Sequence, residues 1–145
     1  MGLLRFIAAL FSRSARPNSG SDDPRHRLGV KGEKLAAKFL RRSGYKILYR
    51  NYRPKGGGEV DIVARDGTTL AFIEVKTRSS DEFGRPADAV TSEKRELIAR
   101  GARSWMRLLD NPDVVFRFDV VEVIAGQAKP EFTLHRAAFI PENTR

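Results

Sequence analysis

Two short segments of the chain combine alternating apolar residues with acidic residues. The first reads Gly58-Glu59-Val60-Asp61-Ile62-Val63 and the second reads Phe72-Ile73-Glu74-Val75-Lys76. Because successive side chains of a β-strand point to opposite faces, Glu74 and Lys76 share one face of the second segment. Carboxylates beside a lysine form a combination that can bind a hard divalent cation and transfer protons.

The relation between the two segments depends on the turn at Asp66-Gly67. A four-residue loop pairs Arg65 with Leu70 and sets Asp61 directly opposite Glu74. A two-residue loop keeps the same faces together, whereas an odd loop without a bulge would separate the acids. The even-loop registers put three carboxylates and one lysine on one face, with Val60 and Ile62 together on the other.

Carboxylates that face each other across a sheet repel and need a compensating cation. We therefore predict that Asp61 and Glu74 bind Mg²⁺ or Mn²⁺, and that Lys76 orients or deprotonates the attacking water. Glu33, at the margin of the preceding predicted helix, is a third candidate ligand. The alternative for Asp61, Glu74 and Lys76 is a cross-strand salt bridge on an exposed face. For Glu33 and Glu59 the alternative is a solvated surface charge.

The elements that must position these residues follow from periodicity and turn signals. Apolar residues at helical spacing predict helices over 29–43 and 91–109, the second capped by Thr91 or Ser92. Strands are expected over 45–53, 58–65, 70–77, 116–123 and 132–136. The order α-β-β-β-α-β-β predicts an antiparallel meander and a helical crossover, and hence an α/β fold with a mixed sheet flanked by helices.

The second predicted helix has an apolar side and a basic side. The apolar side, which we expect to be buried, consists of Leu97, Ile98, Ala102, Trp105, Met106 and Leu109. The basic side consists of Arg100, Arg103 and Arg107, here called the arginine stripe. Together with Arg53 and Lys55, the stripe is a candidate for phosphate contacts, and a solvated helix face is the alternative. Gly56 to Gly58 favour an ordinary turn over a phosphate loop.

The composition restricts the partners and the kind of metal site. Lysine and arginine total 27 against 18 acidic residues, giving a net charge of +9 that favours a polyanion such as DNA or RNA. The chain has no cysteine and two histidines, so a metal would be held by carboxylates. The absence of cysteine is compatible with a reducing compartment, and we expect a cytoplasmic protein.

The first 27 residues differ from the remainder. Residues 2–11 are mostly apolar, and residues 12–27 are rich in serine, arginine and proline. The apolar run is too short to span a bilayer, so we interpret 1–27 as a flexible basic leader and expect no membrane association. A membrane or partner anchor is the alternative for this leader. Residues 28–145 then form one domain.

The motifs of residues 28–140 resemble those of the YraN-like uncharacterised family. They are Gly32-Glu33, Gly44-Tyr45, Arg50-Asn51-Tyr52-Arg53, Gly58-Glu59-Val60-Asp61, Phe72-Ile73-Glu74-Val75-Lys76-Thr77-Arg78, Phe83-Gly84, Lys94 and Arg117-Phe118-Asp119-Val120-Val121, in this order. That family is similar to archaeal Holliday-junction resolvases and to restriction-endonuclease-like nucleases. Their signature is a helix glutamate, an aspartate and Glu-x-Lys.

This resemblance implies a restriction-endonuclease-like fold and a metal-dependent endonuclease acting on DNA, with branched or structured DNA among the substrates. It implies Glu33, Asp61, Glu74 and Lys76 as catalytic residues, the three acids as metal ligands, and Mg²⁺ or Mn²⁺ as the cofactor. A noncatalytic nucleic-acid-binding protein that retains the fold is the alternative, because a fold does not fix a function. A monomer and a homodimer are both compatible with the sequence.

Overall fold

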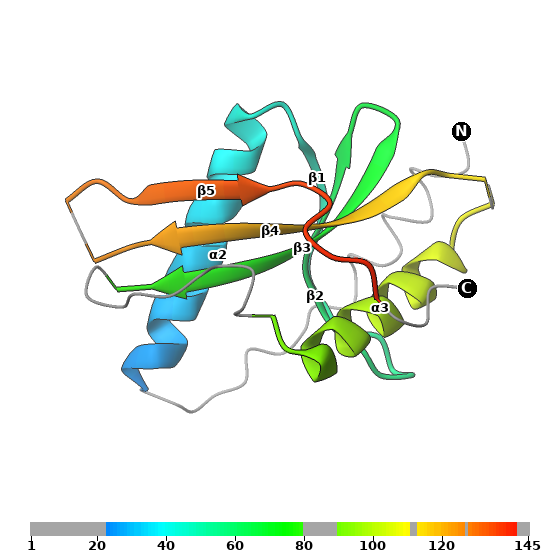
Figure 1. Cartoon of the computed structure of the whole chain (residues 1–145), viewed down its shortest axis with the longest axis horizontal. Coiled ribbons are helices and arrows are strands. Elements are labelled where there is room, and N and C mark those ends of the chain that lie inside the picture. Colours follow the sequence, from blue (N-terminus) through cyan, green and yellow to red (C-terminus); the bar gives the residue numbers. More distant parts are fainter. Residues whose placement is uncertain (1–22, 80–89, 111–112, 127, 142–145) are drawn as a thin grey trace.

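The elements occur in the predicted order (Figure 1). The computed structural model describes residues 23–79, 90–110, 113–126 and 128–141. In chain order they form α2 (Pro24–Arg42), β1 (Lys46–Tyr52), β2 (Val60–Asp66), β3 (Thr69–Arg78), α3 (Ser92–Met106), β4 (Phe116–Ile124) and β5 (Glu131–His135). No helix within these ranges has the length and apolar character that crossing a membrane requires.

The five strands form one sheet in the order β1-β2-β3-β4-β5. The neighbours β1–β2, β2–β3 and β4–β5 are antiparallel, whereas β3 and β4 are parallel. Parallel neighbours need a crossover connection, and α3 lies in the segment between them. The architecture is thus α/β, a mixed five-stranded sheet flanked by two helices, as predicted and consistent with a restriction-endonuclease-like fold.

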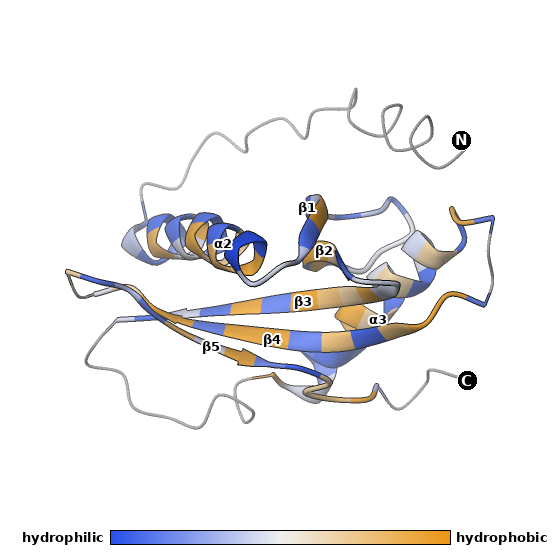
Figure 2. Cartoon of the chain, turned by 90° about the horizontal axis from the view of Figure 1, so that it is seen from above, coloured by the Kyte–Doolittle hydropathy of each residue, from blue (hydrophilic) through white to orange (hydrophobic). Residues whose placement is uncertain are grey.

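Each face of the sheet packs against one helix. Ala36, Ala37 and Leu40 of α2 share a core cluster with Ile62 and Ile73, among others. The second cluster joins α3, through Ile98, Ala102 and Trp105, to the opposite face of the same strands, including Val63 and Phe72. In Figure 1, α2 passes behind β3, β4 and β5, and Figure 2 shows it on one side of these strands. The helices therefore approach the site from different layers.

Helix α2 begins five residues before the predicted start at residue 29. Asp23 is its N-cap, with a side chain that accepts a hydrogen bond from the Arg25 amide at 3.0 Å, and Pro24 occupies the first turn. Both are favourable N-terminal signals. Residues 24–27, assigned to the leader from the sequence, belong to this helix, and residues 1–22 lie outside the described residues.

Helix α3 begins at the predicted cap, since the Thr91 hydroxyl accepts from the Lys94 amide at 3.2 Å. The prediction that Leu97 is buried is wrong, because its exposed fraction is 37%. The contact stripe is centred on Ile98, Ala102 and Trp105, which are spaced by four and three residues, and Leu97 lies about 100° away from Ile98 around the axis. Met106 and Leu109 pack against the same cluster.

The predicted pairing of Val60 with Ile62 on one face is also wrong. Val60 belongs to the cluster on the α3 side, whereas Ile62 belongs to the cluster on the α2 side. Strand β2 starts only at Val60, so regular alternation does not extend to that end. Val60 packs against α3 at Gly101, where a Cβ atom would come within 2.9 Å of the valine Cγ2.

Candidate metal centre

The β2–β3 hairpin has the register that was predicted for a four-residue loop, but Asp66 pairs with Thr69, so the loop itself has two residues, Gly67 and Thr68. Arg65 pairs with Leu70, and the ladder continues to Ile62 opposite Ile73. Beyond that pair, the Asp61 carboxylate accepts a hydrogen bond from the Val75 amide, with an N–O distance of 2.9 Å. The aspartate of β2 is therefore fixed against the part of β3 that carries the glutamate and the lysine.

Glu74 is the most buried acid of this group, with an exposed fraction of 3%. Its Oε1 atom lies 3.5 Å from the Lys76 ammonium and 3.8 Å from that of Lys94. Its Oε2 atom is buried and has no hydrogen-bond partner among the described residues. A buried carboxylate oxygen without a partner is costly, so this oxygen is available to a ligand.

Glu33 reaches the same place from α2. The helix approaches β3 closely at Gly32, where a Cβ atom would lie 1.8 Å from the Thr77 hydroxyl oxygen. Only glycine permits this approach, which brings the following residue over the end of β3. Glu33 lines a cleft of about 620 Å³ together with Asp61, Glu74 and Lys76. Its Oε1 atom is buried without a hydrogen-bond partner among the described residues.

The surroundings favour the protonated forms of both glutamates. Burial, and then the neighbouring Asp61 charge, raise the pKa of Glu74 to about 8. The same two causes raise the pKa of Glu33 to about 7, against opposing effects of nearby cations. Acids that resist ionisation until a cation arrives are characteristic of metal and catalytic sites, although ion-pair networks perturb pKa values as well.

The donor set fits a hard divalent cation. It offers carboxylate oxygens, two of them without partners, and no sulfur or imidazole ligand is needed. Within the described ranges, no group of three or more His, Cys, Asp and Glu side chains is arranged to hold a metal ion directly. Asp61 and Glu74 would therefore be the direct ligands, with Glu33 acting through water. Mg²⁺ commonly keeps several of its waters in such sites.

Glu59 is an ion-pair residue, not a solvated surface charge. Its carboxylate accepts a hydrogen bond from the Lys94 ammonium, and its other oxygen lies 3.9 Å from Arg53 Nε. Burial acts to raise the pKa of Glu59, but Lys94, together with Arg53 and Lys76, outweighs burial and the pKa is lowered. Sequence reasoning assigned no role to Lys94. The available signal was its place in the first turn of a helix, where a cation opposes the helix dipole.

The segment Gly56 to Gly58, for which an ordinary turn was predicted, packs against α3. Gly58 has a φ of +95°, and a Cβ atom there would lie 2.4 Å from the Gly101 amide nitrogen. The Glu59 amide donates to the Leu97 carbonyl at 3.0 Å. The glycines therefore let the chain lie directly on the helix, which carries Glu59 to Lys94.

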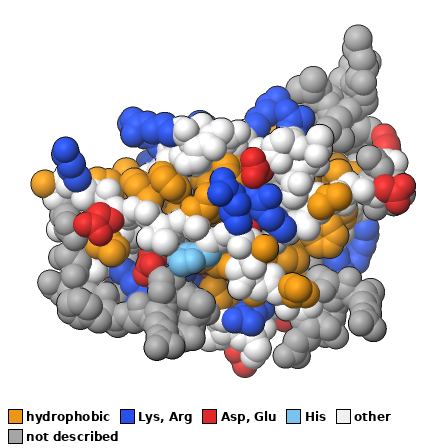
Figure 3. Space-filling model, turned by 45° about the horizontal axis from the view of Figure 1, so that its top comes forward, with side chains coloured by type: hydrophobic (Ala, Val, Ile, Leu, Met, Phe, Trp, Pro, Cys, Tyr) orange, Lys and Arg blue, Asp and Glu red, His pale blue; other side chains and the backbone are white. Residues whose placement is uncertain are grey.

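The residues predicted to contact phosphate differ in their surroundings. Arg53 lines the cleft, and Lys55 is exposed in the turn that follows β1. In the arginine stripe, Arg100 and Arg107 are exposed, whereas Arg103 forms an ion pair with Glu96 at 3.0 Å. On the face drawn in Figure 3, lysine and arginine side chains lie in separate groups among apolar ones. That face alone does not define a nucleic-acid surface.

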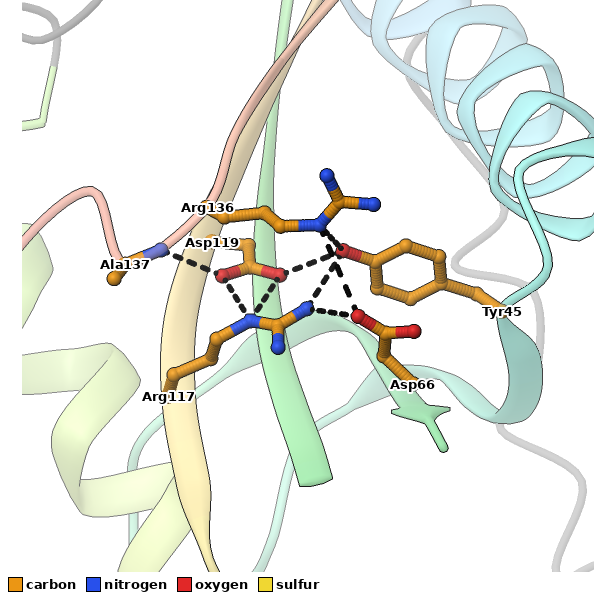
Figure 4. Close-up of polar contacts among 6 residues, drawn as sticks. All are labelled: Tyr45, Asp66, Arg117, Asp119, Arg136 and Ala137. Carbon is orange, nitrogen blue, oxygen red and sulfur yellow. Dashed lines mark hydrogen bonds and ion pairs between the residues drawn. The ribbon is translucent and has the colours of Figure 1, made fainter. Parts of the chain in front are cut away.

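Asp119 belongs to a polar network and does not line the cleft (Figure 4). It accepts from Arg117 Nε at 3.0 Å, from the Ala137 amide at 2.9 Å and from the Tyr45 hydroxyl at 3.2 Å. Arg117 also reaches Asp66 at 2.7 Å. Burial and the Asp119 charge raise the pKa of Tyr45, although the arginines oppose this. The network ties β4 to the turn end of the hairpin, opposite the acidic end.

Comparison with known proteins places the chain in a family. The model of "Uncharacterised protein family UPF0102" matches residues 32–123. A UPF0102 protein of Geobacter metallireducens is 48% identical over 104 residues, which are 72% of this chain and 84% of the relative. One from Chlorobium limicola is 50% identical over 103 residues, 71% of this chain and 78% of the relative. The matched region contains the acidic residues of the cleft and the whole of α3, and the chain therefore belongs to family UPF0102, the YraN-like family that its motifs predict.

Proposed function

We propose that this protein is a divalent-metal-dependent nuclease that hydrolyses phosphodiester bonds in DNA. The observation that supports this best is the meeting of Asp61, Glu74 and Lys76 in one cleft, with Glu33 at its wall. Two of these acids carry buried oxygens without partners among the described residues. Such a site requires a cation, and a cation beside a lysine is suited to phosphoryl transfer.

Each side chain has a distinct task in this proposal. Asp61, held by the Val75 amide, and Glu74 bind Mg²⁺ or Mn²⁺, which supplies positive charge and an acidified water when bound. Lys76, whose ammonium lies 3.5 Å from Glu74, orients or deprotonates the attacking water and offsets charge that develops on the phosphate oxygens. Glu33 holds a water at the opposite wall.

The net charge of the chain and the residues that line the cleft support DNA as the substrate. The net charge of +9 favours a polyanion, and Arg25 and Arg53 line the cleft beside Lys76. These cations hold the backbone phosphates on either side of the scissile bond, and the arginine stripe of α3 adds nonspecific contacts. The proposed activity requires contacts with backbone phosphates and none with base edges, as is expected of an enzyme that recognises the shape of its substrate.

A cleavage screen tests the proposal. The full chain is incubated with branched, nicked, duplex and single-stranded DNA, and with RNA, in Mg²⁺, Mn²⁺ or EDTA. We expect metal-dependent cleavage of at least one DNA substrate, lost in Asp61→Asn and retained in Glu131→Gln, a matched change at an exposed residue of β5. Binding without cleavage in every metal would refute the nuclease and favour the noncatalytic nucleic-acid-binding protein.

A further inference from the structure

A lysine from the second helix lies at the acidic centre. Lys94 occupies the first turn of α3, and its ammonium hydrogen-bonds Glu59 while lying 3.8 Å from Glu74 Oε1. Its side chain is only 24% exposed. The other lysine of the site, Lys76, contacts Glu74 from the same strand. Lys94 is therefore the cation that joins the two acids across different elements.

The position of Lys94 is unfavourable for the helix itself. The first turn of a helix carries the positive end of the dipole, where acidic residues stabilise and cations destabilise. Lys94 is also partly buried, which disfavours its charge, yet its ammonium lies within ion-pair distance of both Glu59 and Glu74. A charge held against both effects indicates that the acids, and not the helix, determine the place of this residue.

The partner of Lys94 is fixed independently of the cleft. Glu59 is held against α3 by the hydrogen bond that its backbone amide donates to the Leu97 carbonyl and by the close approach of Gly58 and Gly101. Glu59 and Lys94 thus form a preassembled pair beside Glu74. If a divalent cation neutralised Glu74, the pair would stay in place, and the lysine would lose one of its two acidic neighbours.

We propose that Lys94 is the internal counter-ion of the acidic centre, which pairs with Glu59 beside Glu74 when no metal is bound and contacts a substrate phosphate when a metal takes over Glu74. This inference rests on the proposed function, because it requires a metal and a phosphate at the same site. Lys94 competes with the metal for Glu74, and the competition ends when the ammonium turns to an anionic oxygen of the substrate. It is a positioning and binding residue, distinct from Lys76.

Removing a counter-ion should strengthen metal binding, whereas removing a metal ligand should weaken it. Calorimetric titration of the full chain with Mg²⁺ and with Mn²⁺ should give tighter binding for Lys94→Met, by about threefold or more, because like charges a few Å apart repel. Lys38→Met, which removes an equal charge from an exposed position on α2, should match the parent, and Lys94→Arg should remain near it. Unchanged or weaker binding in Lys94→Met would overturn the counter-ion role.

A second measurement needs no metal. In EDTA, Lys94→Met should unfold at a lower temperature than the parent, and added Mg²⁺ should reduce the difference. A purely structural salt bridge with Glu59 predicts equal losses in Lys94→Met and Glu59→Gln that metal does not change. That pattern would also overturn the proposal.

The phosphate contact is tested by DNA binding, independently of cleavage. In Ca²⁺, Lys94→Met should lower the magnitude of the salt slope of duplex binding by about 0.9, the value for one lost contact, and by less in EDTA. An unchanged slope in Ca²⁺ would overturn this part. Failure of the proposed nuclease appears separately, as absence of cleavage by the parent protein in Mg²⁺ and Mn²⁺.

Discussion

Replacing Glu74 with glutamine should stabilise the metal-free protein at high pH. Glu74 is almost fully buried, and its pKa is raised from 4.5 to about 8. Between these two values the folded state keeps a proton that the unfolded state has lost, so stability falls as the pH rises through this window. Glutamine has a similar shape and no charge, and it removes this contribution.

The size of the effect follows from the shift. One pKa unit corresponds to about 1.4 kcal/mol, so a rise from 4.5 to about 8 gives an upper limit of about 5 kcal/mol at pH 9. We expect about 2 kcal/mol or more, because the site relaxes when it ionises, and almost no difference at pH 5. Glu33, with its pKa of about 7, contributes in the same direction in both proteins, so its contribution cancels in their difference.

Urea unfolding followed by tryptophan fluorescence measures this difference. The chain has one tryptophan, Trp105, which is 2% exposed and reports on the α3 core. Parent, Glu74→Gln and the control Glu131→Gln are compared in EDTA at pH 5 and pH 9. Saturating Mg²⁺ should stabilise the parent and not the Glu74 variant, which reverses their order. If Glu74→Gln is no more stable than the parent at pH 9 without metal, the argument from burial is wrong.

Three further predictions concern catalysis, binding and packing. Lys76→Ala should keep metal binding and reduce single-turnover cleavage by about a hundredfold or more, with arginine restoring little; a parent-like rate would contradict the assigned role. Alanine throughout the arginine stripe should lower the salt slope of duplex binding by roughly 1.8, as for two contacts, since Arg103 already pairs with Glu96; a parent slope would make the stripe a solvated face. Gly32→Ala should destabilise by about 1–3 kcal/mol in urea unfolding, and Thr77→Ala should recover part of the loss; equal stability of parent and Gly32→Ala would contradict the close approach.

The hairpin and the sheet were predictable because their signals are local. The two-residue period of β3 and the Asp66-Gly67 turn set the register that brings Asp61 to the part of β3 that carries Glu74. The crossover was predictable from a long amphipathic segment between two strands. The capping signal at Asp23 and Pro24 was equally local, but the polar composition of the preceding residues concealed it.

The remaining features depend on contacts between distant segments. No spacing in the sequence links Glu59 to Lys94, because 35 residues separate them and a contact between glycines brings them together. Leu97 has the same hydrophobicity as a core residue, and only the packing of α3 on the sheet decides which side it faces. The burial that perturbs Glu33 and Glu74 likewise depends on how α2 packs on the sheet and cannot be derived from the strand pattern.

The two helices that meet at the acidic end of the hairpin lie on opposite faces of the sheet. During synthesis, the segment from α2 to β3 emerges first and already contains Glu33, Asp61 and Glu74, whereas Lys94 follows with α3. Until α3 docks, the acids lack the cation that bridges Glu59 and Glu74. The residues that line the cleft all belong to this first segment. Docking of α3 therefore adds the balancing charge to walls that are already synthesised, and the two layers are coupled electrostatically.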